Sequence, residues 1–165
     1  APRPNHPALR HAAATRAHLL GGLGRWNEAA HELATLAGRH PADAVCHFNW
    51  GYALQQTRAW DLAEQAFRRA VLLSPGLDLA WYGLGDVLCQ QGRWLDAEAA
   101  WLQQSALQPF CPDGLTRLVG LYVELGRWSD AEARLRQLKA FDPRRAWLLE
   151  SALPRSMGSP EVHRT

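Results

Sequence analysis

Two histidines near the start of the chain, His11 and His18, have the spacing that comes nearest to a metal-binding pair. On a helix, seven residues span about 10 Å. Both side chains would then face the same side, but too far apart to share one ion without further ligands. We therefore expect solvated histidines and no metal site.

The three cysteines, Cys46, Cys89 and Cys111, stand 43 and 22 residues apart. This pattern offers neither a paired disulfide framework nor a Cys-x-x-Cys metal motif. We expect reduced thiols, which are typical of the cytoplasm, although a signal sequence already removed would leave no trace. No run approaches the roughly 18 apolar residues of a membrane span. The sequence thus predicts a cytoplasmic protein without a membrane-spanning segment.

The sequence lacks the motifs of catalysis and nucleotide binding, namely a Gly-rich phosphate loop, a Gly-x-Ser-x-Gly elbow and a His-Glu-x-x-His pair. The acids Glu64, Glu98 and Glu132 recur every 34 residues, which indicates surface groups of a repeated unit rather than a general acid and base. We predict that the protein is not an enzyme and has no cofactor.

The charge balance bears on partners and source. Eighteen basic and sixteen acidic residues nearly cancel, without a dense basic stripe, so we expect no nucleic-acid partner. All basic residues except Lys139 are arginine. With the high Ala and Leu content, this favours a GC-rich, bacterial genome.

The elements that position these residues follow one period. Tryptophan recurs every 34 residues, and proline keeps the same spacing fifteen residues later (Trp26, Trp60, Trp94, Trp128; Pro41, Pro75, Pro109, Pro143). A period of this length indicates one unit copied four times. We expect these tryptophans to be core anchors, so that Trp94→Ala destabilises the whole array.

Each unit is predicted to be an antiparallel pair of helices. A small residue and a bulky apolar one follow each tryptophan at offsets of three and seven, as Ala63 and Phe67 do after Trp60, which is helical spacing. Apolar residues before each tryptophan recur at offsets of three, four and seven, and Gly51 and Gly85 among them indicate close helix approach. The helix-ending place holds Gly24, Gly92 and Gly126, for which a left-handed conformation is expected, whereas Arg58 stands there in the second copy.

These residues resemble the tetratricopeptide repeat family. The third copy matches its pattern through Trp81, Leu84-Gly85, Leu88, Ala97, Trp101 and Pro109, and the second through Gly51, Leu54, Ala63, Phe67, Ala70 and Pro75. The resemblance implies an all-α fold, a right-handed α-solenoid of antiparallel helix pairs with a short C-terminal capping helix. Its concave side, lined by the first helices, would bind a peptide or a partner protein.

The predicted organisation is a lead-in (1–9), four repeats (10–43, 44–77, 78–111 and 112–145), a capping helix (146–154) and a disordered tail (155–165). In the capping helix, Trp147 and Leu148 are expected to cover the apolar face of the fourth repeat.

The resemblance also selects residues that line the concave groove. These are Phe48, Asn49, Tyr52, Gln55, Gln56, Leu79, Tyr82, Asp86, Gln90 and Arg117. Aromatic surface beside amides suits an extended peptide. Alternatively, Phe48 and Tyr82 pack between adjacent repeats.

One known binding mode of the family is not expected. Members that clamp the C-terminal carboxylates of heat-shock chaperones use Lys, Asn and Arg at set groove positions. The matching places here hold Ala14, His18, Asn49, Leu79 and Gly83, of which only Asn49 agrees.

Three functions remain open at this point. The favoured one is a non-catalytic bacterial scaffold or assembly factor, a monomer, that holds a peptide or protein in its groove. The alternatives are a chaperone similar to those of type III secretion translocators, and a regulatory or substrate-docking domain of a larger enzyme.

Overall fold

The computed structural model describes residues 7–153. In this part of the chain all regular structure is helical, and the helices are α1 (Pro7–Gly22), α2 (Trp26–Arg39), α3 (Ala44–Gln56), α4 (Trp60–Leu73), α5 (Asp78–Gln90), α6 (Trp94–Leu107), α7 (Pro112–Glu124), α8 (Trp128–Lys139) and α9 (Pro143–Ala152). The all-α solenoid of helix pairs is thereby confirmed. Helix α1 already begins within the stretch assigned to the lead-in, and the predicted tail lies outside the described residues.

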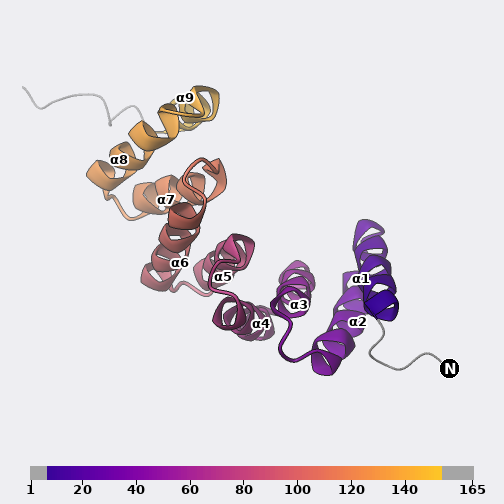
Figure 1. The fold of residues 1–165 in the computed structure, drawn as a ribbon. Coiled ribbons are helices and arrows are strands. Elements are labelled where there is room, and N and C mark those ends of the chain that lie inside the picture. The colour runs from indigo at the N-terminus through magenta and orange to yellow at the C-terminus, as the bar shows by residue number, and fades with distance from the viewer. Residues whose placement is uncertain (1–6, 154–165) are drawn as a thin grey trace, which may run out of the picture. The chain divides into compact units, whose positions relative to one another are not determined.

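The helices form two compact units. The first runs to Leu107 and holds α1 to α6, and the second begins at Gln108 and holds α7 to α9. Within each unit, every helix packs against the next one along the chain (Figure 1), and α3 also contacts α5. None of the helices in residues 7–153 is long and apolar enough to cross a bilayer.

The turn between the two helices of a repeat has the same shape in all four copies. Gly24, Gly92 and Gly126 have φ angles of 74°, 73° and 67°, and Arg58 has a φ of 60°. The backbone amide of the residue that follows this position donates a hydrogen bond to a carbonyl in the last turns of the preceding helix. An example is the bond from Ala59 to Leu54 at 3.0 Å. Arg58 is therefore held in the left-handed region that glycine adopts without a steric penalty.

Bulky rings at the seventh position after Trp60 and Trp94 fill the core of the first unit. Phe67 and Trp101 are 0% and 2% exposed. Gly85 lies so close to Trp101 that an added Cβ would come within 2.5 Å of the indole, and Gly51 approaches Phe67 to 3.0 Å in the same way. These contacts are the close helix approach that Gly51 and Gly85 predicted.

The expectation that the periodic tryptophans anchor the core is wrong. Trp94 and Trp128 are 45% and 40% exposed, and Trp26 and Trp60 are half-buried. All four are the first residue of their helix, so no preceding turn of that helix covers the ring. The buried stripe instead begins three residues later, at Ala97 and Ala131.

In the second unit, α9 is joined to α7 and α8. Asp142 caps α9 by accepting a hydrogen bond from the Arg145 amide, and Arg145 reaches Asp113 of α7 at 2.8 Å. The buried residue of α9 is Ala146. Trp147 and Leu148 are 63% and 52% exposed, so the prediction that they cover an apolar face is wrong.

Candidate binding pocket

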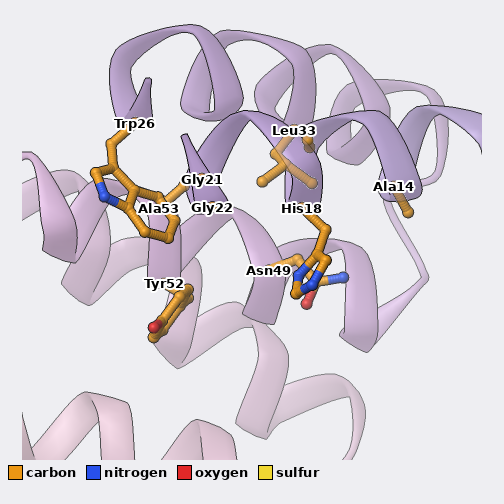
Figure 2. A pocket seen from close by; sticks show the side chains of 10 residues that line it. Ala14, His18, Gly21, Gly22, Trp26, Leu33, Asn49, Tyr52 and Ala53 are labelled. Atoms are coloured by element: carbon orange, nitrogen blue, oxygen red, sulfur yellow. The ribbon is translucent and has the colours of Figure 1, made fainter. Parts of the chain in front are cut away.

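A pocket of about 290 Å³ lies between α1, α2 and α3 in the first unit (Figure 2). It is lined from α1 by Ala14, Ala17, His18, Gly21 and Gly22, from α2 by Trp26 and Leu33, and from α3 by Asn49, Tyr52 and Ala53. Most of this lining is apolar, with a few polar groups among it. Pockets of this composition are typical ligand sites.

Small residues on α1 leave the space open. Ala14 and Ala17 are three residues apart and therefore lie on the same side of the helix, with Gly21 one turn further on. The Trp26 ring packs directly against this helix, because a Cβ added at Gly21 would come within 2.5 Å of the ring. Gly21 thus fixes the place of the tryptophan in the pocket wall.

Aromatic rings and polar groups form the rest of the wall. Trp26 and Tyr52 meet edge to face, with centroids 5.6 Å apart and an interplanar angle of 78°. Tyr52 is 46% exposed, His18 is exposed and Asn49 is half-buried. The His18 and Asn49 side chains line the same space (Figure 2). An amide both donates and accepts hydrogen bonds, as does a neutral imidazole, so a main-chain segment at the rim could pair with either.

The predicted groove residues are not all brought together. Asn49 and Tyr52 are the two that line this pocket. Phe48 is half-buried and packs against Phe67 of the same repeat, with ring centroids 6.1 Å apart, and not between adjacent repeats as the alternative had it. Gln55 and Gln56 are in the last turn of α3.

The other predicted residues lie on α5 and α7. Leu79 is 53% exposed, Tyr82 and Asp86 are half-buried, and Gln90 is exposed. Arg117 is exposed on α7 and belongs to the second unit. The place of these five residues in a binding groove stays a prediction.

The other eight lining residues were not among the predicted groove residues. Trp26 was interpreted only as a core anchor, and Gly21 was not interpreted. Ala14 and His18 were considered only as places of a carboxylate clamp that was not expected, and His18 also as a metal ligand. A signal was present, because Ala14 occupies the place held by Phe48 one repeat later. A small residue where the next copy has a ring predicts empty space.

The periodic acid Glu64 has a structural role in the first unit. Its carboxylate accepts from Arg68 and from Arg93, both at 2.7 Å, and its side chain is 15% exposed. Burial opposes its ionisation, but hydrogen bonds from Arg68, Arg93 and Gln91 outweigh burial and hold the pKa of Glu64 below its ordinary value. Because Arg93 precedes α6, this acid joins two repeats.

Over residues 7–153, no group of three or more His, Cys, Asp or Glu side chains could hold a metal ion.

Comparisons with known proteins agree with this architecture. The family model described as tetratricopeptide repeat matches residues 15–78 and 48–113. A crystal structure of MamA protein has a TM-score of 0.76 at 16% identity, with 85% of this chain and 78% of that chain covered. TTC0263, a thermophilic repeat protein of Thermus thermophilus, has a TM-score of 0.72 at 21% identity, with 91% and 80% covered.

A third similar structure contains a ligand. It is the first repeat domain of Spaghetti (RPAP3), bound to the HSP90 peptide SRMEEVD, with a TM-score of 0.68 at 16% identity and coverage of 71% of this chain and 93% of that chain. At these identities the likeness concerns the fold alone. No curated protein matches the sequence.

Proposed function

Because this chain belongs to the tetratricopeptide repeat family, we propose that it is a non-catalytic interaction module that holds an extended segment of a partner protein, with the pocket between α1, α2 and α3 as the anchoring site. The partner is a protein, and the module serves as a scaffold or assembly factor in a bacterial cytoplasm. The family typically mediates interactions between proteins rather than catalysis, and one structure of similar fold is bound to a peptide.

One observation carries this function. The pocket combines two rings in edge contact, Trp26 and Tyr52, with the amide of Asn49 at its rim. The rings can bury an apolar side chain, while the amide can pair with the main chain of an extended segment. Such a combination suits a peptide better than a small polar metabolite, for which more convergent polar groups are needed.

The function is tested by identifying and then titrating a partner. The full chain is used to capture proteins from the source cell, and fragments of a captured protein are titrated against the wild type, Tyr52→Ala and Asn49→Ala. We expect at least a roughly tenfold loss of affinity for Tyr52→Ala, because truncation of an aromatic anchor often costs 2 kcal/mol or more. Circular dichroism should show unchanged helical content.

A matched control separates the pocket from the general surface. Leu72 of α4 is 70% exposed and does not line the pocket. Leu72→Ala should leave affinity unchanged. If folded Tyr52→Ala and Asn49→Ala bind as tightly as the wild type, the partner binds elsewhere and the proposed function of the pocket is wrong.

A further inference from the structure

The first two repeats differ at one pair of positions that decides whether the pocket exists. Ala14 and Leu33 line the pocket in the first repeat. Their equivalents 34 residues later are Phe48 and Phe67. Those two rings pack on each other at 6.1 Å, and Phe67 is 0% exposed. The second repeat thus fills with aromatic rings the place that the first leaves open.

The opposite wall differs in a way that adds polarity. In the second repeat, Phe67 packs against the backbone of α5 at Gly83, where an added Cβ would come within 2.5 Å of the ring. The equivalent of Gly83 in the pocket is Asn49, whose side chain lines the cavity. The first repeat therefore lacks a ring on α1 and gains a hydrogen-bonding amide on α3.

We propose that this pocket accepts an aromatic side chain of the partner, which takes the place that Phe48 fills in the next repeat. This inference rests on the proposed function and specifies its ligand: an extended segment with an exposed Phe, Tyr or Trp. The ring enters beside Ala14 and Leu33, at the end of the pocket away from Trp26 and Tyr52 (Figure 2), while Asn49 pairs with the adjoining main chain.

Size and surface chemistry favour an aromatic group over an aliphatic or charged one. A volume of about 290 Å³ is at the lower end for ligand pockets, which suits one large side chain rather than a multi-ring molecule. The equivalent place in the second repeat holds a ring, since Phe48 packs there on Phe67 with centroids 6.1 Å apart. The lining holds no Lys, Arg, Asp or Glu that would pair with a charged ligand.

The ligand class is tested first with small probes. N-acetylphenylalaninamide, N-acetylleucinamide and N-acetyllysinamide are titrated separately into the ¹⁵N-labelled full chain, and the backbone amide signals of Ala14 and Ala17 and the side-chain amide of Asn49 are followed. We expect these signals to shift with the phenylalanine probe at millimolar concentration, several-fold less with leucine and not with lysine. No shift with the phenylalanine probe, or equal shifts with all three, would overturn the proposal.

A variant that rebuilds the second-repeat arrangement gives the second test. Ala14→Phe should place a ring in the pocket and weaken the phenylalanine probe at least about tenfold, with the melting temperature unchanged or raised. Ala12→Phe, at an exposed position of the same helix, should leave probe binding intact. Should Ala14→Phe fail to fold, Ala14→Leu fills part of the same space. A folded Ala14 variant that binds the probe like the wild type would contradict the proposal.

The captured partner separates this inference from the proposed function. Loss of partner binding in both Ala14→Phe and Tyr52→Ala, but not in Ala12→Phe, supports the aromatic anchor. Loss in Tyr52→Ala and Asn49→Ala with full binding by folded Ala14→Phe leaves the proposed function in place and rejects the aromatic anchor. Full binding by all these variants rejects both.

Discussion

The ring of Phe67 lies against the backbone of Gly83, at a distance that leaves no room for a side chain: a Cβ added at this glycine would come within 2.5 Å of the ring. Phe67 belongs to α4 and Gly83 to α5, so this contact brings one repeat against the next. The same ring is approached from α3 by Gly51, to 3.0 Å by an added Cβ. A single phenylalanine is thus enclosed by the first helices of two repeats.

Gly83→Ala should destabilise the first unit because the added methyl group meets a buried ring that has nowhere to move. Overpacking of this kind costs about 1–3 kcal/mol. Gly38→Ala is the control, since this glycine is inside α2 and an added Cβ meets nothing within 4 Å. The control should gain up to about 1 kcal/mol of helix propensity. Urea unfolding followed by circular dichroism measures both, and equal stabilities would contradict the close contact.

Arg58→Gly should stabilise the protein. Arg58 has a φ of 60°, a conformation that costs a residue with a Cβ about 1–2 kcal/mol. Glycine removes this strain but loses more entropy on folding, so we expect a net gain on the order of 1 kcal/mol. Gly92→Ala at the equivalent turn should lose stability for the same reason, since its φ is 73°. A loss of stability in Arg58→Gly would show that the arginine side chain contributes more than the strain costs.

The two tryptophans of α6 should differ in their contribution to stability. Trp101 is 2% exposed, and Trp101→Ala should cost about 3–5 kcal/mol. Trp94 is 45% exposed, and Trp94→Ala should cost about 1 kcal/mol. Thermal unfolding of the two variants distinguishes them. A larger loss for Trp94→Ala would restore the interpretation of the periodic tryptophan as a core anchor.

The ion pairs of Glu64 should make part of the stability depend on pH. Its pKa is lowered from an ordinary value of 4.5, so the native state favours the carboxylate. This contribution is fully present above the pKa of the unfolded chain and is lost as pH falls through the lower, native pKa. Because Arg68 and Arg93 are 49% and 42% exposed, solvent screening limits the pairs to less than about 1 kcal/mol.

Glu64→Gln should therefore lower the free energy of unfolding at neutral pH and have a smaller effect well below pH 4.5. Glu132→Gln, at the exposed equivalent position of α8, should change stability little at either pH. The measurement is urea unfolding at the two pH values. An effect of Glu64→Gln that is the same at both would mean that the lost interaction is not electrostatic.

The sequence contained most of the fold because its period and its helical stripes repeat together. The left-handed turn at Arg58 could be predicted from the glycines at the same place in other copies. The exposure of Trp94 could not be predicted from periodicity, which marks a recurring position but does not say whether a ring at the first residue of a helix is covered. Trp147 and Leu148 were assigned to a buried face for a similar reason, and Ala146 is the residue that packs there.

The pocket was predictable only in part. Asn49 and Tyr52 came from the positions that the resemblance assigns to the groove. The cavity itself exists because aromatic rings are missing at two positions, which hold Ala14 and Leu33 instead. Nothing in these two apolar residues by themselves indicates a binding site. Their meaning appears only when one copy is compared with the next, and the approach of Trp26 to Gly21 requires the coordinates.

The exchange of Phe48 and Phe67 for Ala14 and Leu33 makes binding capacity a property of individual modules rather than of the whole array. A repeat has such a pocket when it lacks the aromatic ring on its first helix, and the pocket is filled when the ring is present. The open pocket lies in the first repeat. An engineered chain with Phe48→Ala and Phe67→Leu would carry a second pocket in the second repeat. Two such pockets would select partners whose aromatic residues are separated by the distance between neighbouring repeats.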